Sequence, residues 1–192
     1  MTKPRVTVLD HGMGNLPSVV KALEAAGADA RVSTSIDDHA DALCVPGQGV
    51  FGRCMSALSR AGLGEQILGW IGDARPYLGI CLGMQILFDH SEEGDVVGLG
   101  ALAGRVTRLT GPVRVPHIGW NTVSRGDGEV YFYFDHSFAV HPDDGGIVKG
   151  WCEHGERFAA WIEGDGLTAV QFHPEKSSRD GIALLRDWVA RV

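Results

Sequence analysis

A chain of 192 residues is long enough to bury one substantial hydrophobic core, so we expect a single domain. Its composition, 44% hydrophobic and 21% charged, is that of an ordinary globular protein. The net charge of −7 argues against a general nucleic-acid surface, because clustered Lys and Arg bind phosphate backbones. No apolar run is long enough to span a bilayer and no signal segment begins the sequence, so we expect no membrane contact and a cytoplasmic location.

The cysteines are far apart in the sequence and form no CxxC pair. This spacing suggests neither a zinc site nor a redox dithiol, and we expect free thiols, no metal and no cofactor. The four residues are Cys44, Cys54, Cys81 and Cys152.

Strand-like and helical segments alternate in the first half of the chain. Asn15 is a suitable N-cap and Gly27 a suitable end for the first helix. Loops rich in turn residues follow the first and third strands, at residues 10–15 and 46–51. The expected elements are strands over residues 5–9, 30–33 and 42–45 and helices beginning near residues 16, 53 and 63.

The stretch from Tyr77 to Phe88 places a thiol on a bend. An apolar run after Pro76 predicts a buried parallel strand, and Leu82, Gln85, Ile86 and Phe88 predict the first turns of a helix. Cys81 then lies on a nucleophile elbow, with Gly79 and Gly83 where strand and helix approach closely. The helix N-terminus favours a thiolate. The alternative, a buried structural cysteine, has no need of the flanking glycines.

The sequence pattern in the second half of the chain predicts mostly strands. A final helix over 179–189 has Ser178 as its expected cap and presents Ile182, Leu185, Trp188 and Val189 to a core. The fold class is therefore α/β, with a mixed, mostly parallel sheet, flanking helices and an antiparallel extension in the C-terminal half. The strand-like runs, expected to form a meander, cover residues 102–109, 129–134, 147–153, 158–162 and 167–172.

His173 and Glu175 follow the last strand-like run, and Pro174 between them cannot continue a central ladder. Two residues apart, the two side chains can point the same way. A thiol needs a base to become a thiolate and an acid to protonate its leaving group, and a carboxylate can orient the histidine that does both. Cys81, His173 and Glu175 all lie at the carboxyl ends of predicted parallel strands. Open α/β sheets place their sites at this edge, so we expect the three side chains to lie close together.

The motifs GICLGMQ (79–85) and FHPEKS (172–177) resemble those of the class I, triad-type glutamine amidotransferases. Within that family, DHGMGNL (10–16), PGQG (46–49) and VPHIGWN (115–121) resemble the glutaminase subunits of imidazole glycerol phosphate synthase, of histidine biosynthesis. Because these motifs span nearly the whole chain, the resemblance implies a flavodoxin-like fold and one amidotransferase domain over residues 1–192.

The resemblance implies a reaction as well as a fold. Cys81 would attack the side-chain amide of L-glutamine, His173 would relay the proton and Glu175 would orient His173. Ammonia would leave, water would hydrolyse the glutamyl thioester, and a (β/α)₈ cyclase partner in a heterodimer would receive the ammonia.

Further roles follow from the resemblance residue by residue. The oxyanion hole would use backbone N–H groups of Leu82 and of the Gln48–Gly49 segment. Substrate-binding residues would be Gly49, Gln85, Glu93, Ser137 and Phe138, and the partner-facing residues Asn15, Trp120, Tyr133 and Lys176. His117, His136 and His141 are interpreted as structural or substrate-shell residues.

Simpler interpretations stand beside these roles: Gln85 as an exposed helix residue, Trp120 as a core aromatic and Lys176 as a solvated charge. The chain could also be the glutaminase of anthranilate or GMP synthesis, or a non-catalytic docking module of the same fold. The PHIGWN segment argues against the first and the intact triad against the second. The departures from the family pattern are His11 for tyrosine, Pro17 for arginine, Gln48 for a small aliphatic residue and Asp135 for an apolar one.

Overall fold

Five parallel strands form the centre of the molecule. The computed structural model describes residues 2–126 and 128–192. The strands run in the order β2-β1-β3-β4-β13, and β3 and β4 are buried along their whole length, as is typical of parallel strands covered on both faces. Their bounds are Arg5–Leu9 (β1), Asp29–Ser33 (β2), Ala42–Gly47 (β3), Tyr77–Cys81 (β4) and Leu167–Val170 (β13).

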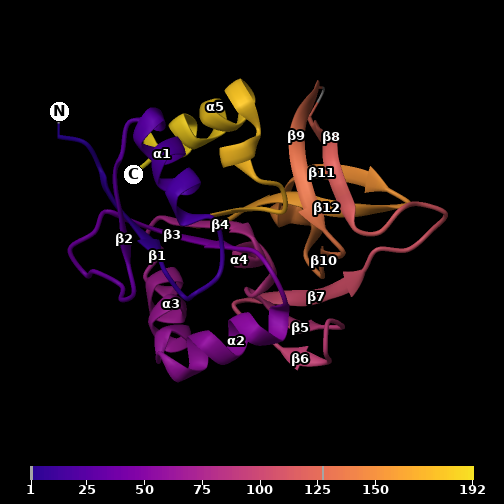
Figure 1. Cartoon of the computed structure of the whole chain (residues 1–192), viewed down its shortest axis with the longest axis horizontal. Coiled ribbons are helices and arrows are strands. Elements are labelled where there is room, and N and C mark those ends of the chain that lie inside the picture. Colours follow the sequence, from indigo (N-terminus) through magenta and orange to yellow (C-terminus); the bar gives the residue numbers. More distant parts are fainter. Residues whose placement is uncertain (1, 127) are drawn as a thin grey trace.

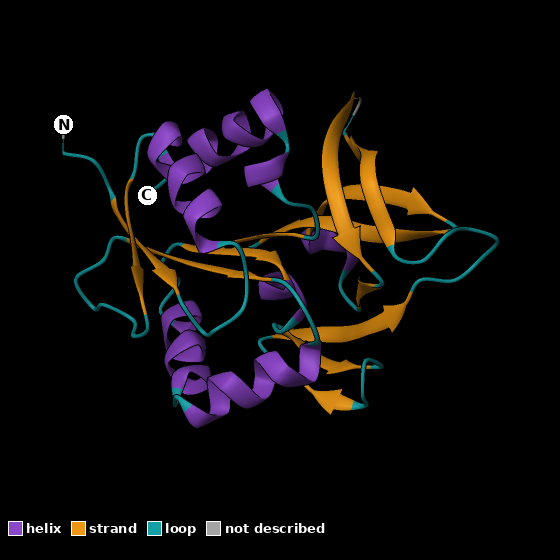
Figure 2. Ribbon diagram, viewed as in Figure 1, coloured by secondary structure: helices purple, strands orange, loops and turns teal. Residues whose placement is uncertain are grey.

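Helices cover both faces of this parallel sheet (Figures 1 and 2). One face is covered by α1 (Leu16–Ala26) and α5 (Ser178–Val189), the other by α2 (Phe51–Arg60) and α3 (Leu63–Gly72). As the sequence predicts, the Asn15 side chain caps α1 by accepting a hydrogen bond from Ser18 N at 3.4 Å, and Gly27 ends it at φ 110°. The helices thus enclose two apolar cores, one on each side of the sheet.

The sheet continues beyond β13 as a mostly antiparallel extension (Figure 2). From β12 it runs through β10, β7, β5 and β6, while β11 leads from β12 to the ribbon of β8 and β9. In Figure 1 this ribbon stands to the right of α5. The bounds are Phe88–Ser91 (β5), Val96–Val97 (β6), Leu102–Arg108 (β7), His117–Arg125 (β8), Gly128–His136 (β9), Phe138–Pro142 (β10), Val148–His154 (β11) and Glu156–Glu163 (β12).

Two predictions about the secondary structure are wrong in part. The last strand-like run is not part of a meander, because β13 inserts beside β4 as a central parallel strand and only its other neighbour, β12, is antiparallel. The helix after Cys81 does not reach Phe88: α4 (Leu82–Gln85) is a single turn, and Phe88 begins β5, which pairs with β7. Competition from this sheet pairing ends the helix.

The cap of α5 also differs from the prediction. Ser178 is the first residue of the helix, with φ 53°, and Ser177 holds the N-cap position without making a side-chain cap. The Ser177 hydroxyl instead donates to the His173 carbonyl at 2.6 Å and accepts from Tyr133 N at 2.9 Å. Its hydrogen bonds therefore hold the segment that contains the short helix η2 (Pro174–Lys176) against β9.

The carboxyl ends of the central strands determine where a site can form. The loop after β1, the loop after β3, Cys81 at the end of β4 and residues 171–176 after β13 all lie at this edge. In an open parallel sheet this edge is where ligands bind.

Candidate active site

Cys81 occupies a strained bend between β4 and α4. Its backbone has φ 54° and ψ −105°, a conformation that side-chain-bearing residues rarely adopt. A Cβ on Gly79 would lie 2.8 Å from the carbonyl carbon of Gly83, and a Cβ on Gly83 would collide with the carbonyl oxygen of Val45. The Tyr77 hydroxyl donates to the Gly83 carbonyl at 2.8 Å and fixes the turn. The predicted elbow and its need for two glycines are therefore present.

His173 and Glu175 form a buried pair beside this elbow. His173 Nδ1 donates to Glu175 Oε1 at 2.8 Å, and the two side chains are only 2% and 3% exposed. Burial lowers the pKa of His173, but the Cys81 sulfur and the Glu175 carboxylate outweigh this effect and raise the pKa to about 10. Among the described residues His173 Nε2 has no hydrogen-bond partner, so this nitrogen is free to exchange a proton with a reacting group.

The backbone around His173 is held by neighbouring strands. His173 N donates to the Tyr133 carbonyl of β9 at 2.8 Å, and Ser177 links the His173 carbonyl to Tyr133 N. These bonds fix the position of the imidazole relative to the sheet. Tyr133 is thus connected both to the His173 segment and to the outer face of the β8–β9 ribbon.

A cavity of about 270 Å³ opens at Cys81, close to the lower end of the range for small-molecule sites. Five residues expected from the sequence to bind substrate, and the expected oxyanion residue Leu82, are among those that line it. The lining residues are Gly49, Cys81, Leu82, Gln85, Glu93, Pro116, Asp135, His136, Ser137 and Phe138. The structure therefore brings together segments that are far apart in the sequence, although Gln48 is not in this lining.

Two carboxamides lie behind the thiol. Gln85 Nε2 donates to the Phe138 carbonyl at 2.8 Å and to Gln171 Oε1 at 3.0 Å. Gln171 Nε2 in turn donates to Cys81 Sγ at 3.5 Å. Gln85 is 4% exposed, so it is not the exposed helix residue of the simpler interpretation.

The loop after β3 is held from both sides. His11 Nε2 donates to the Pro46 carbonyl at 2.7 Å, and His11 Nδ1 lies 3.8 Å from Cys54 Sγ. At the other side, Gln48 Nε2 donates weakly to Asp135 Oδ2 at 3.5 Å. Two departures from the family pattern, Gln48 and Asp135, thus contact each other across the rim of the cavity.

A chain of neutral histidines supports the far wall of the cavity. His136 Nδ1 donates to the Phe138 carbonyl at 2.9 Å, which leaves His136 Nε2 to accept from His117 Nδ1 at 3.1 Å. His117 Nε2 then accepts from Asn121 Nδ2 at 3.2 Å. Burial lowers the pKa of His136 to about 3 and of His117 to about 4, so both rings are neutral near pH 7 and each tautomer is fixed.

Three of the expected partner-facing residues, Trp120, Tyr133 and Lys176, lie together at the outer side of the β8–β9 ribbon. Trp120 is 53% exposed, unlike a core aromatic, and meets Tyr133 edge-on with ring centroids 6.2 Å apart. Lys176 Nζ lies 5.6 Å from the Tyr133 ring centroid and 3.7 Å from Asp135 Oδ2. Asn15 is exposed at the start of α1, which packs against η2.

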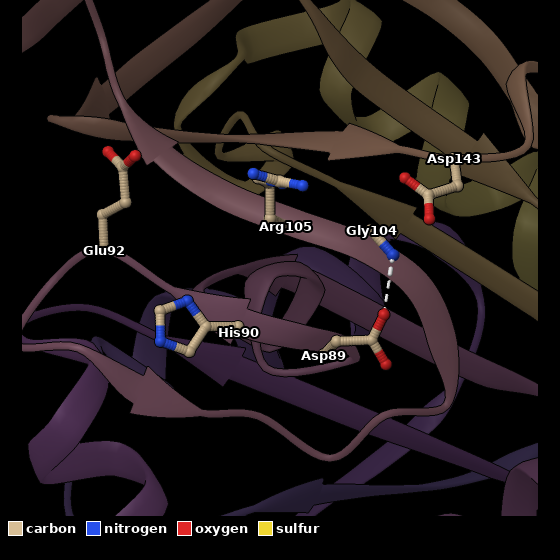
Figure 3. Close-up of a pocket in the computed structure, with 6 residues that line it drawn as sticks. All are labelled: Asp89, His90, Glu92, Gly104, Arg105 and Asp143. Carbon is tan, nitrogen blue, oxygen red and sulfur yellow. Dashed lines mark hydrogen bonds between the residues drawn. The ribbon is translucent and has the colours of Figure 1, made fainter.

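A second cavity, of about 390 Å³, is larger but contains no nucleophile (Figure 3). Its six lining residues come from β5, β7 and nearby loops, and the Asp89 carboxylate accepts a hydrogen bond from Gly104 N at 2.9 Å. They are Asp89, His90, Glu92, Gly104, Arg105 and Asp143. Size alone therefore does not identify the active site, and the thiol cavity is the candidate.

The described part of the chain contains neither a candidate metal site nor a candidate membrane-spanning helix. Residues 2–126 and 128–192 contain no group of three or more His, Cys, Asp or Glu that could hold a metal ion. In the same residues no helix is long and apolar enough to cross a membrane. All four cysteines are buried and free, as expected.

The chain matches known proteins along nearly its whole length. Residues 7–192 match the family model described as glutamine amidotransferase class-I. The chain belongs to the class-I glutamine amidotransferase family. Among its relatives, the imidazole glycerol phosphate synthase subunit HisH of Nocardia farcinica is 45% identical, covering 98% of this chain and 99% of that protein. The proteins of the same name from Dechloromonas aromatica and Methanothermobacter thermautotrophicus are each 42% identical, covering 96% of this chain and 95% and 97% of their own lengths.

Solved structures support the amidotransferase fold. A crystal structure of a glutamine amidotransferase gives a TM-score of 0.75 at 19% identity and covers 96% of this chain and 98% of its own. The PurLQS structure from Thermotoga maritima gives a TM-score of 0.74 at 17% identity, over 99% and 97%. At these identities the likeness concerns the fold alone, which agrees with the α/β class predicted from the sequence.

Several residues that shape this site are not predicted by the sequence analysis. Gln171 is one, although it stands two residues before His173 and alternate positions of an extended segment share a face. Pro116 and Ser177 are two more: Pro116 lines the cavity and Ser177 anchors the His173 backbone. No local pattern marks these two, because their roles depend on contacts with distant segments.

Proposed function

We propose that this amidotransferase is the glutaminase subunit of an imidazole glycerol phosphate synthase. It hydrolyses L-glutamine to glutamate and ammonia and delivers the ammonia to a (β/α)₈ cyclase subunit. The relatives that carry that synthase's name over the full chain length support this choice of reaction. The observation that carries it is the thiol of Cys81 on its strained elbow, in a cavity beside the buried His173–Glu175 pair.

The first half of the reaction forms a thioester. The Cys81 thiol gives its proton to His173 Nε2, and the sulfur attacks the side-chain carbonyl carbon of glutamine. The tetrahedral intermediate collapses by breaking the C–N bond, and His173 returns the proton to the leaving nitrogen, which departs as ammonia. The hydrogen bond from His173 Nδ1 to Glu175 supports this role, because the carboxylate orients the imidazole and stabilises its charged form.

The second half hydrolyses the thioester. His173 takes a proton from water, and the resulting hydroxide attacks the acyl carbon. The C–S bond then breaks with its electron pair going to sulfur, and the proton on His173 passes to the sulfur, so that glutamate leaves and the thiol is regenerated. Catalysis by one base in both halves is consistent with the buried position of His173 beside the thiol.

An oxyanion develops in each half of this reaction and needs hydrogen-bond donors. We assign this role to backbone N–H groups of Leu82, at the start of α4, and of the Gln48–Gly49 segment. Gly47 and Gly49 flank Gln48, and Gly49 has φ 118°, so the backbone that carries the Gln48 N–H can reorient with little steric resistance. Preorganised donors of this kind are among the largest contributions to acyl transfer.

Substrate contacts are assigned to the remaining wall of the cavity. Both hydrogens of Gln85 Nε2 are already used, so Gln85 offers its oxygen to the substrate as an acceptor. The Glu93 carboxylate already accepts from Phe51 N at 2.8 Å and keeps capacity for a second donor, such as the substrate ammonium. Gly49, Ser137 and Phe138 complete this surface through their backbones.

The docking surface for the cyclase is assigned to Asn15, Trp120, Tyr133 and Lys176. The exposed Trp120 ring and its contact with Tyr133 support this choice, because aromatic residues are enriched at the centres of interfaces. We further propose that the whole chain is one amidotransferase domain, since one continuous sheet runs through both halves, and that it works in the cytoplasm, where its free thiols stay reduced.

The test is to follow glutamate release by the purified chain, alone and with a cyclase subunit and its nucleotide ligand. We expect the lone chain to be nearly silent and the complex to be about a thousandfold faster, a coupling of ~4 kcal/mol. High activity of the lone chain that no cyclase changes would indicate a free-standing hydrolase instead.

Cys81→Ala in the same complex tests the nucleophile. Glutamine-dependent synthesis should disappear, while synthesis from added ammonia and the fold should survive, because the side chain is small and its role is chemical. Glutamine hydrolysis within tenfold of the unsubstituted complex would refute the assignment of Cys81.

A further inference from the structure

We propose that Gln171 is a further catalytic residue, whose side-chain N–H stabilises the Cys81 sulfur as the leaving group when the thioester is hydrolysed. This inference rests on the glutaminase reaction proposed above. Gln171 directly follows β13, and the described structure gives its side chain no exposure to solvent. Its Nε2 contacts the reacting sulfur itself, at 3.5 Å.

The orientation of the Gln171 amide is determined by its neighbours. The Phe138 carbonyl can only accept, so Gln85 must turn its Nε2 toward that carbonyl, and the same Nε2 reaches Gln171 at 3.0 Å. Gln171 must therefore present its oxygen to Gln85 and its nitrogen to the sulfur. The Phe138 carbonyl is itself fixed by His136 Nδ1 at 2.9 Å, so the orientation does not depend on a freely rotating group.

A buried carboxamide at this position is costly unless it has a function. Residues on the two sides of it, Val170 and Phe172, are fully buried apolar side chains, and an apolar residue of similar volume would pack there without any polar group to satisfy. The donor that Gln171 carries is directed at an atom whose charge changes during the reaction. We therefore assign the donor to chemistry and not to packing.

The charge on sulfur differs between the two halves of the reaction. During acylation a thiolate becomes a neutral thioester, so a hydrogen bond to sulfur weakens as the C–S bond forms. During deacylation the C–S bond breaks and its electron pair returns to sulfur. The hydrogen bond from Gln171 to sulfur therefore becomes charge-assisted as the transition state is passed. An N–H donor at 3.5 Å thus favours expulsion of the thiolate and contributes less to its attack, since a stabilised thiolate is also a weaker nucleophile.

This asymmetry predicts a kinetic signature. Loss of the donor should slow hydrolysis of the glutamyl thioester about tenfold to a hundredfold, as expected for a hydrogen bond to a charged group. The value of kcat/KM, which reports steps up to ammonia release, should change by less than about threefold. The acyl-enzyme should therefore accumulate during turnover.

The experiment uses Gln171→Met, which keeps the side-chain length but has no N–H donor, in the complex with the cyclase and its nucleotide ligand. Rapid mixing with L-glutamine, acid quenching and intact mass measurement give the rates at which the glutamyl thioester forms and decays. Thr168→Val is the matched control: Thr168 is buried on the same strand, β13, but contacts Arg191 at the opposite end, and this variant should deacylate normally. Should Gln171→Met not fold, Gln171→Leu carries the same measurement.

The outcomes separate this inference from the proposed function. If the unsubstituted complex forms no glutamyl thioester, the glutaminase proposal fails. If it forms the thioester but the Gln171 variants hydrolyse it within threefold of the normal rate, only the role of Gln171 fails. A fall in kcat/KM as large as the fall in deacylation would also overturn the inference, because it would indicate a loosened substrate site instead of a lost leaving-group contact.

Discussion

Cys81 carries its thiol on a backbone conformation that costs a non-glycine residue about 1–3 kcal/mol. The surroundings compensate for this cost. Gly79 and Gly83 allow the close approach of strand and helix, and the Tyr77 hydroxyl holds the Gly83 carbonyl. Within the elbow the strain therefore falls on Cys81, the proposed nucleophile, and places its sulfur at the open edge of the sheet.

His136 and His117 should make the free energy of unfolding fall as the pH becomes acidic. Burial lowers the pKa of His136 to about 3 and of His117 to about 4, from an ordinary value of 6.5. A group with a depressed folded-state pKa stabilises the protein above its unfolded pKa and loses that contribution as the pH falls through the folded value. We expect the free energy of unfolding, measured with urea, to fall between pH 6.5 and pH 4, and to fall less steeply in His136→Gln.

The control for this measurement is His39→Gln, since His39 is exposed. The pH dependence of the free energy of unfolding in His39→Gln should match that of the unsubstituted chain. A flat stability profile between pH 6.5 and pH 4 would contradict the neutral histidine chain.

His173 acts in the opposite sense. Its pKa is raised to about 10, so its contribution to stability is present below pH 6.5 and is lost as the pH rises toward 10.

At the scale of elements, the loop after β3 allows a test of the oxyanion assignment through Gln48. If the donor is a backbone N–H, Gln48→Ala should cost little, because the side chain makes only one long contact, 3.5 Å to Asp135. Gln48→Pro should lower turnover about 10²- to 10³-fold, since proline removes the N–H and fixes φ. Substrate affinity should change less than turnover, because the interaction is made mainly in the transition state.

Steady-state glutaminase kinetics of both variants in the activated complex provide the measurement. Gln48→Ala is the matched control for Gln48→Pro, as it removes the same side chain and keeps the N–H. If Gln48→Ala were crippled and Gln48→Pro near normal, the side chain would carry the role and the backbone assignment would have to be withdrawn.

The elements that the sequence predicts well are those with strong local signals. Helix α1 has its Asn15 cap and its Gly27 end, and β3 and β4 are short apolar runs between turn residues. The β8 strand escaped prediction because its outer face carries large apolar side chains, Ile118 and Trp120, which blur the alternation typical of a half-buried strand. Whether a segment such as Phe88 continues a helix or enters a sheet is decided by distant pairing, here with β7.

The same distinction applies to the site. Cys81, His173 and Glu175 stand at turns with their own sequence signals, so their proximity could be predicted. The hydrogen bonds from Asn121 to His117 and from His117 to His136 could not be predicted. They depend on the register in which His117 pairs with His136 across β8 and β9. Supporting contacts of this kind follow from topology and not from local pattern.

At the scale of the whole molecule, the exposed cluster on the β8–β9 ribbon is expected to bind the cyclase. Trp120→Ala should weaken binding by about 2 kcal/mol, or roughly thirtyfold in Kd, as for an aromatic residue near the centre of an interface. Titration calorimetry with the purified subunits is the measurement. Val97→Ala, which truncates a 71% exposed residue on β6, is the control and should bind normally. Equal affinities for the two variants would place the interface elsewhere.

The position of β13 has a consequence for how the protein is made. This strand lies beside β4 near the centre of the whole sheet, where the parallel strands meet the antiparallel extension, and the segment that follows it returns to Cys81 across 90 residues of sequence. During translation Cys81, the proposed nucleophile, therefore leaves the ribosome well before β13 and His173, the proposed base. Until β13 inserts, a nascent chain has the Cys81 thiol without the proposed proton acceptor beside it, so we expect it to release no ammonia. We expect activity to require that β13 has taken its place in the sheet.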